Sequence, residues 1–247
     1  MNCIRIRFYG DLNDFLLPKQ GQRAFTYCFK DERSIKDLIE SLGVPHVEVG
    51  LLLIDGEPED FSQLVFGGEQ IAVYPHFTRL DLSSLPHVQP EPLSEFRFVL
   101  DVHLGKLASS LRMLGFDTFY RNDAPDDELA AISAKENRIL LTFDRQLLKR
   151  KNVNYGYLVR SRDPDQQVVE ILKRFNLFDR QRPFRRCMVC NGLLRSASRE
   201  EVEDSIPENV RQTLNEFSCC PSCGRVYWKG SHYQRMQRAI EKFINQT

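Results

Sequence analysis

Strand and helix patterns alternate through residues 96–180, and this alternation limits the possible folds more than any other feature. Short apolar runs typical of buried strands occur at 96–100, 116–120, 138–143 and 157–159. Helical spacing of apolar residues separates or follows them at about 104–114, 126–137 and 168–175. Repeated strand–helix units form a parallel sheet with helices on both faces, so we predict an α/β domain over 96–180.

Residues 1–78 predict a separate small domain. Alternating apolar residues predict strands at 4–8 and 25–29, and further strands at 51–54 and 71–74 follow a helix at 35–42. This order resembles the ubiquitin-like β-grasp, in particular its sulfur-carrier branch. Sulfur carriers end in a free Gly-Gly, whereas here the last strand continues into Tyr74-Pro75, so the resemblance does not extend to sulfur transfer. Gly67-Gly68 precedes that strand and predicts a turn.

The overall composition is that of an ordinary globular protein. Thirty-four basic residues balance 34 acidic ones, and 42% of the chain is hydrophobic, which excludes disorder along its whole length. No window approaches the roughly 20 apolar residues of a membrane helix, and the first residues do not resemble a secretory leader. We therefore expect a cytoplasmic protein without a membrane partner. Residues 79–95, with Pro86, Pro90 and Pro92, predict a linker.

Five of the seven cysteines lie in the last quarter of the chain, over residues 181–247, for which we predict a zinc ribbon and a C-terminal helix. Two Cys-x-x-Cys pairs stand 29 residues apart and supply the four thiolates that a structural zinc needs: Cys187, Cys190, Cys220 and Cys223. Cys219 is an alternative to Cys220 with poorer spacing. Cys3 and Cys28 lie in strand-like surroundings and are predicted to be buried thiols.

Acidic residues mark the ends of the predicted parallel strands. Asp101 follows the first strand and Asp144 the third, while Asp126, Asp127 and Glu128 begin the intervening helix. Ligands of an open parallel sheet bind outside the carboxyl ends of its strands, so we expect Asp101 and Asp144 to face one crevice. Clustered carboxylates suit Mg²⁺ or Mn²⁺, which can activate water against a phosphodiester. The alternative interpretation is local: acids favour helix N-termini, and strand-end aspartates make turns.

Positive charge gathers beside this acidic cluster. Residues 145–186 contain twelve basic and four acidic side chains within a chain of zero net charge, as a phosphate-backbone substrate requires. Tyr227, Trp228 and Tyr233 add possible stacking surfaces. The predicted RNA contacts are Lys106, Arg112, Arg145, Arg160, Arg162 and His232.

These motifs together resemble one family. The runs Asp101–Ala108 and Leu111–Asp117, the "LT-x-D" segment Leu141–Asp144, and both cysteine pairs with the following Gly224–His232 are similar to motifs of the Mut-seven C-terminal (Mut7-C) RNase family. This family is a branch of the PIN-like nucleases, and its members often carry an N-terminal ubiquitin-like domain. The resemblance implies metal-dependent RNA cleavage at Asp101, the acids at 126–128 and Asp144. PIN nucleases usually supply a further acid, for which Asp163 is the nearest candidate.

The sequence thus predicts a ubiquitin-like domain, a PIN-like ribonuclease domain and a zinc ribbon. Asp101 and Asp144 would hold Mg²⁺ or Mn²⁺, with Asp127 completing the site and Asp126 or Glu128 assisting. The main alternative is a non-catalytic RNA-binding adaptor that recruits a protein partner through its ubiquitin-like domain. A sulfur-transfer accessory is a third possibility, which the missing terminal Gly-Gly disfavours.

Overall fold

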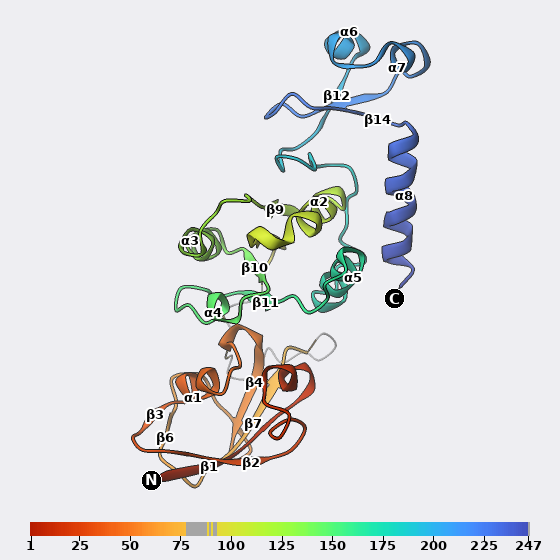
Figure 1. The fold of residues 1–247 in the computed structure, drawn as a ribbon. Helices are drawn as coiled ribbons and strands as arrows, with labels where there is room; N and C mark the ends of the chain where they lie inside the picture. The colour runs from red at the N-terminus through yellow and green to blue at the C-terminus, as the bar shows by residue number, and fades with distance from the viewer. Residues whose placement is uncertain (78–87, 89, 91–92, 247) are drawn as a thin grey trace. The chain divides into compact units, whose positions relative to one another are not determined.

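The computed structural model describes residues 1–77, 88, 90 and 93–246, so the predicted linker at 79–95 lies largely outside the described residues. The chain divides into two compact units. The first contains Met1–Glu95 and Pro125–Leu158, and the second contains Phe96–Ala124 and Val159–Thr247. Each unit is described by itself below (Figure 1).

The N-terminal part of the first unit is a mixed β-grasp sheet. Its five strands lie in the order β2-β1-β7-β4-β5. Strands β1 and β7 are parallel, whereas the other neighbours are antiparallel. The bounds are β1 Asn2–Phe8, β2 Phe25–Phe29, β4 Val49–Ile54, β5 Glu57–Pro58 and β7 Gln70–Pro75. A small antiparallel pair, β3 Arg33–Ser34 and β6 Leu64–Val65, and the 3-10 helices η1 Gly10–Phe15 and η2 His46–Glu48 complete it.

The residue pattern explains these elements. Ile4, Ile6 and Phe8 are buried along β1 while Arg5 and Arg7 are exposed, because successive side chains of a strand point to opposite faces. Helix α1 (Ile35–Ser41) begins at Ser34, whose hydroxyl accepts a hydrogen bond from the Asp37 N–H. The helix packs Ile35, Leu38 and Ile39 into the core. Gly67 and Gly68 both have positive φ, which confirms the predicted turn.

Cys3 and Cys28 differ from the prediction. They face one another across β1 and β2, are half-buried, and form a disulfide. The prediction of two buried thiols was therefore wrong. The periodicity placed both cysteines in strands, but it did not give the register that pairs them.

The first unit also contains an α/β segment of the central region. Helix α3 (Asp126–Glu136) leads through Asn137, in the left-handed conformation, to strand β10 (Ile139–Thr142). Helix α4 (Arg145–Leu148) and strand β11 (Gly156–Leu158) follow, and β11 lies parallel to β10. All residues of β10 and β11 are buried, which explains their continuous apolar sequence.

This segment packs directly on the β-grasp sheet. Glu48, in η2, is fully buried and accepts a hydrogen bond from the Leu158 N–H at 2.7 Å. His46 lies 2.6 Å from the Glu40 carboxylate and 3.0 Å from the Val153 carbonyl oxygen. Polar side chains in the interior need such partners, and here the Val153 carbonyl and the Leu158 N–H come from more than 100 residues away in sequence.

The second unit begins with the other strand–helix pair of the central region. Strand β8 (Arg97–Leu100) lies parallel to β9 (Asp117–Phe119), and η3 (Val102–Leu104) and α2 (Gly105–Met113) connect them. Gly115 ends this connection with φ +94, and a Cβ there would lie 2.1 Å from the Arg182 carbonyl oxygen. Helix α5 (Pro164–Arg174) packs against α2. Parallel strands with covering helices confirm the predicted α/β class.

The C-terminal part of the second unit is a three-stranded antiparallel ribbon. Its strands are β12 Arg195–Ala197, β13 Phe217–Cys219 and β14 Val226–Trp228, in that order. The long spacer between the cysteine pairs contains α6 (Arg199–Val202), η4 (Glu203–Ser205) and α7 (Glu208–Thr213), which bury Val202, Ile206 and Phe217 as a small core. Helix α8 (Ser231–Ile244) contacts α5, where Lys242 pairs with Asp165 at 3.0 Å (Figure 1).

In the part of the chain that the structure describes, no helix combines the length and apolar character needed to cross a bilayer.

Candidate functional site

The two cysteine pairs form loops with the same backbone hydrogen bonds. The Cys187 N–H donates to the Gly192 carbonyl, and the Asn191 N–H donates to the Cys187 carbonyl. Cys220 repeats this pattern with Arg225 and Gly224. The equivalent residues Asn191 and Gly224 have φ of 69° and 72°, the left-handed conformation that closes such a tight turn.

Glycine has a different role in each loop. Gly224 supplies the left-handed turn directly, whereas in the first loop Asn191 takes that conformation. Gly192 instead allows close packing, because a Cβ there would lie 3.0 Å from the Cys220 sulfur and 2.7 Å from the Ser222 hydroxyl. Of the two glycines, only Gly224 therefore takes the left-handed conformation itself.

The four sulfur atoms gather in a geometry suited to one metal ion. All lie within 4.8 Å of one another, with Cys187 and Cys223 3.7 Å apart and Cys190 and Cys220 3.3 Å apart. Thiolates bound to one tetrahedral zinc would lie roughly 3.8 Å from one another. The donor set and spacing therefore fit a structural zinc, which would use all four protein ligands and leave no open position for catalysis. Cys219 is not part of this group.

The environment of these thiols makes their acidity unequal. Burial acts to raise the pKa of Cys187, but hydrogen bonds from the Tyr227 hydroxyl and from the backbone N–H groups of Cys190 and Val189 outweigh it and lower that pKa from 9.0 to about 6. Burial and the neighbouring cysteines raise the pKa of Cys190 to about 12. Burial and then Cys187 raise the pKa of Tyr227, so its hydroxyl stays protonated and can donate to the thiolate.

Arg112 fastens the first cysteine loop to the α/β part of the second unit. Its side chain is buried and donates to the carbonyl oxygens of Met188 (3.2 Å) and Val189 (2.7 Å) in the loop. It also donates to the carbonyls of Thr118 and Tyr120. The prediction that Arg112 contacts RNA was therefore wrong, because its guanidinium is committed to holding the loop.

The strand-end aspartates act locally as helix caps. Asp101, after β8, is 5% exposed and accepts a hydrogen bond from the His103 N–H at 2.8 Å. Asp144, after β10, is exposed and accepts one from the Gln146 N–H at 2.7 Å. Asp163 likewise caps α5 through the Gln166 N–H. Asp101 belongs to the second unit and Asp144 to the first, so their approach to a shared ion stays a prediction.

The acids at the start of α3 already have a cationic partner. Asp127 contacts Arg150, and Asp126 lies 4.0 Å from the same guanidinium. These three side chains lie in the first unit and are exposed or half-buried. A divalent ion at Asp126 or Asp127 would therefore have to compete with Arg150.

The other predicted RNA contacts differ in availability. Lys106, Arg162 and His232 are exposed, and Arg160 is half-buried. Arg145 donates to the carbonyls of Asp14 and Phe15 in the β-grasp part of its unit, and it lies over the Phe15 ring. At least one basic residue of the segment 145–186 thus stabilises the fold.

Sequence reasoning missed the residues that support the metal centre. Tyr227 lies 3.1 Å from the Cys187 sulfur, and Asn191 binds the Thr118 N–H and the Asp117 carboxylate. The position of Asn191 directly after Cys190 was an available signal. Nothing in the sequence pattern indicated that Tyr227 and Arg112 support the cysteine loops, because this role depends on tertiary contacts.

The described residues thus combine a mixed N-terminal β-grasp sheet, strand–helix segments of the α/β class and a C-terminal four-cysteine cluster. Residues 96–240, more than half of the chain, match the family model described as "Mut7-C RNAse domain", and residues 1–81 match the model "Mut7-C ubiquitin". The chain therefore belongs to the Mut7-C RNase family. No curated protein and no solved structure matches it.

Proposed function

We propose that this protein is a metal-dependent ribonuclease that hydrolyses RNA phosphodiester bonds. The observation that carries the proposal is the match of residues 96–240 to an RNase domain model. Within these residues, Asp101 follows β8 and Asp144 follows β10. Membership of a nuclease family indicates the class of reaction. The carboxyl ends of the strands are where ligands usually bind in an α/β sheet.

The proposed site uses hard oxygen ligands, which fit Mg²⁺ or Mn²⁺. Asp101 and Asp144 would hold the ion, with Asp127 completing the site and Asp126 assisting. Such an ion, when bound, lowers the pKa of water and neutralises charge on the phosphate. Asp144 is exposed. Among the described contacts, only one of its carboxylate oxygens accepts a hydrogen bond, from the Gln146 N–H, so the other oxygen can bind a ligand.

The basic residues would orient the substrate rather than react with it. Lys106, Arg160, Arg162 and His232 are proposed to bind the phosphate backbone, since cationic side chains supply most of the affinity for nucleic acid. The cysteine centre would hold a structural zinc.

A second function, a non-catalytic RNA-binding adaptor, is favoured by one observation. Arg150 contacts Asp127 and lies near Asp126, so two of the proposed catalytic acids are paired with a cation. In the adaptor, RNA binding would persist without cleavage, and the ubiquitin-like domain would recruit a protein partner.

The test compares cleavage of labelled single-stranded and structured RNA by the zinc-loaded protein with and without added Mn²⁺. Omitting Mn²⁺, rather than adding EDTA, leaves the cysteine centre intact, and zinc content is measured in each sample. Asp101→Asn/Asp144→Asn should reduce cleavage at least about 100-fold. Asp179→Asn, an exposed aspartate outside the proposed site, is the matched control and should cleave normally.

Cleavage that survives both the omission of Mn²⁺ and the double substitution would refute the metal site. RNA binding by the wild-type protein without any cleavage would favour the adaptor.

A further inference from the structure

A cavity of about 430 Å³ lies within the second unit, between the ribbon sheet and the first turns of α8. Its volume falls within the roughly 300–1,000 Å³ of small-molecule sites. The large side chains that line the cavity include Phe184, Tyr227, Trp228, Lys229, Tyr233 and Met236. None of them is among the proposed catalytic or metal-binding residues.

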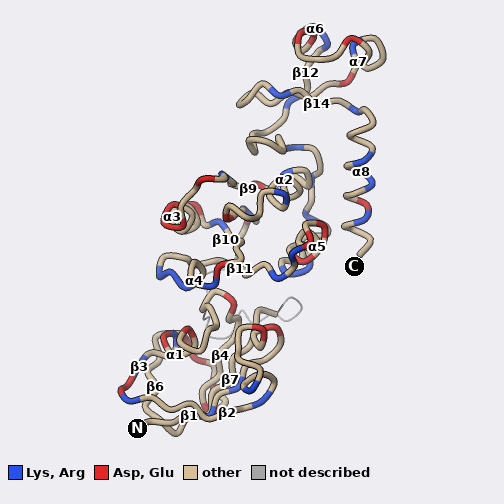
Figure 2. The backbone as a smooth tube through the Cα atoms, viewed as in Figure 1, with Lys and Arg blue, Asp and Glu red and all other residues tan. Residues whose placement is uncertain are grey.

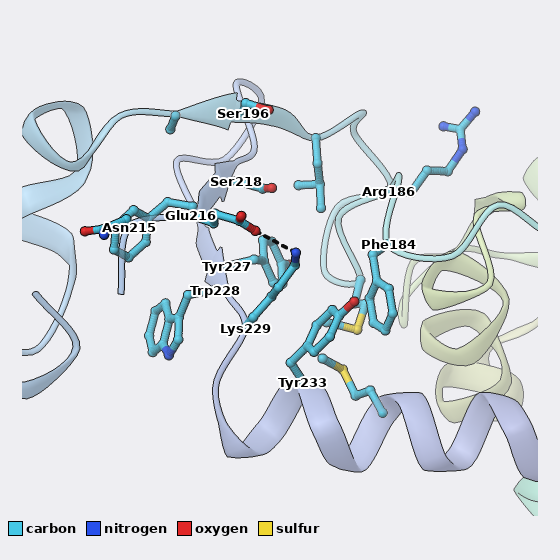
Figure 3. A pocket seen from close by; sticks show the side chains of 15 residues that line it. Phe184, Arg186, Ser196, Asn215, Glu216, Ser218, Tyr227, Trp228, Lys229 and Tyr233 are labelled. Atoms are coloured by element: carbon cyan, nitrogen blue, oxygen red, sulfur yellow. Dashed lines mark hydrogen bonds and ion pairs between the residues drawn. The ribbon is translucent and has the colours of Figure 1, made fainter. Parts of the chain in front are cut away.

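Aromatic rings form much of the cavity wall. Figure 3 shows Phe184 and Tyr233 on one side of Lys229 and Trp228 on the other, with Tyr227 behind. The rings of Phe184 and Tyr233 are 4.5 Å apart between centroids, and all four aromatic residues are half-buried. Tyr227 is fixed from behind by its contact with Cys187. The four-cysteine cluster thus holds one wall of the cavity in place.

Polar groups line the same cavity. Ser196 and Ser218 face one another across β12 and β13, and no hydrogen bond of either hydroxyl occurs among the described residues. Lys229 lies at the cavity and pairs with Glu216 at 2.6 Å; both are largely exposed (Figure 3). An apolar core gap would not carry this set of donors and acceptors. A flat ligand with a polar edge fits it.

The chain segments that carry the cavity residues are rich in basic side chains. Outside the α6–α7 insertion, residues 181–198 and 214–247 contain nine basic and only two acidic side chains. The acids of this region gather in the insertion, on α6, η4 and α7, whereas basic residues follow α8 (Figure 2). The two cations that line the cavity, Arg186 and Lys229, are paired with Asp117 and Glu216, so the remaining basic residues of these segments would attract a polyanionic ligand.

We propose that this cavity binds an unpaired base of single-stranded RNA, with the base stacking among Trp228, Tyr233 and Phe184 and the adjoining phosphates facing the basic residues. Aromatic platforms within positive surfaces are the common means of holding single strands, because every base has a face that can stack. This inference rests on the proposed function, since it identifies the substrate as single-stranded RNA.

Trp228 makes the proposal directly measurable, because it is the only tryptophan in the chain. The full-length, zinc-loaded protein is titrated with a ten-nucleotide single-stranded RNA without added Mg²⁺ or Mn²⁺, and Trp228 emission is followed. Saturable quenching is expected. Tyr233→Ala should weaken the affinity about tenfold or more, and Tyr233→Phe should restore it.

Tyr9→Ala is the matched control. Tyr9 is also a half-buried tyrosine stacked on another ring, Tyr74 at 4.2 Å, but it belongs to the first unit. It should leave RNA affinity unchanged. Unaltered zinc content and circular dichroism of Tyr233→Ala would show that the ribbon remains folded.

Two probes separate base stacking from charge attraction. Inorganic polyphosphate and a blunt RNA duplex should leave the emission largely unchanged at concentrations where the single strand saturates it. Equal quenching by either probe would overturn the proposal, as would single-strand affinity that is unaffected by Tyr233→Ala. Those results would leave the cavity to another occupant, such as an apolar side chain of a protein partner.

The two proposals can fail separately. Quenching that meets all these criteria in a protein that cleaves no RNA would retain the base site and reject the ribonuclease. Mn²⁺-dependent cleavage without quenching would do the reverse.

Discussion

Arg112 shows how a single side chain can be misread when only its charge and position are known. It lies in α2, the α-helix that follows the candidate catalytic residue Asp101, and it was predicted to bind RNA. In the structure it is 4% exposed and donates to four carbonyl oxygens. A buried guanidinium is tolerated because its donors are satisfied, so Arg112 stabilises the join between α2 and the first cysteine loop.

We predict that Arg112→Leu lowers the free energy of unfolding by at least about 3 kcal/mol, because several buried carbonyls lose their donor at once. Thermal unfolding of the zinc-loaded protein, together with its zinc content, provides the measurement. Lys106→Leu alters an exposed basic residue of the same helix and should change stability by less than about 0.5 kcal/mol. Equal stability of the two variants would contradict this role for Arg112.

The acidity of Cys187 gives a prediction with a definite sign. Its pKa is lowered to about 6, after burial is outweighed by the Tyr227 hydroxyl and two backbone N–H groups. Below that pH zinc must displace a proton from Cys187, whereas above it the thiolate is already present. The number of protons released on zinc binding should therefore fall by about one between pH 5 and 7.5.

Calorimetric titration of the chelator-treated protein with zinc, in buffers of different ionisation enthalpy, measures this release. Tyr227→Phe removes the hydroxyl that lowers the pKa of Cys187, so the change in proton release should move to higher pH. Tyr233→Phe removes a hydroxyl from the neighbouring cavity and should not move it. A release that stays constant across this range in the wild-type protein would contradict the assignment.

At the scale of elements, sequence patterns located most strands and helices but few of their partners. Burial alternation along β1 and the helix predicted at 35–42 are local properties, and both were confirmed. Helix α5 begins at Pro164, earlier than the predicted 168, because its Asp163 cap precedes the apolar spacing on which the prediction relied. The short helices within the cysteine spacer have at most six residues, too few to repeat an apolar pattern, so periodicity did not reveal them.

The candidate sites show the same division. Cysteine spacing predicted which four sulfur atoms gather, because each loop is a local motif. Support from Tyr227 and the commitment of Arg145 to β-grasp carbonyls depend on contacts between residues distant in sequence. For the same reason the disulfide between Cys3 and Cys28 was missed, since it depends on how β1 and β2 are aligned.

The disulfide should stabilise the β-grasp sheet. It closes a loop between residues 25 apart, and a cross-link of this span removes unfolded-state entropy worth about 3 kcal/mol. Cys3→Ser/Cys28→Ser should therefore accelerate amide hydrogen exchange in β1 and β2. Cys219→Ser replaces a half-buried cysteine outside the disulfide and the metal centre, and it should leave exchange there unchanged. Unaltered protection in the double variant would argue against a stabilising cross-link.

At the scale of the whole chain, the ubiquitin-like domain is more than an appended module. In the first unit it shares buried polar contacts with the α/β segment, through His46 with Val153 and through Lys149 with the Glu40 carbonyl. Part of its surface is thus used within the protein. A separate protein partner would have to bind elsewhere on this domain.

Glu48 is the sharpest test of this coupling. It is fully buried, and its carboxylate accepts the Leu158 N–H at the end of β11. Glu48→Ala leaves that amide without its acceptor, which should cost about 1–3 kcal/mol. Because the lost bond joins segments 110 residues apart, amide exchange should accelerate in β11 as well as around η2. Glu32→Ala, an exposed change in the same domain, should affect neither. If Glu48→Ala accelerated exchange only around η2, the β-grasp sheet and the α/β segment would be energetically independent, and this buried carboxylate would stabilise its own domain alone.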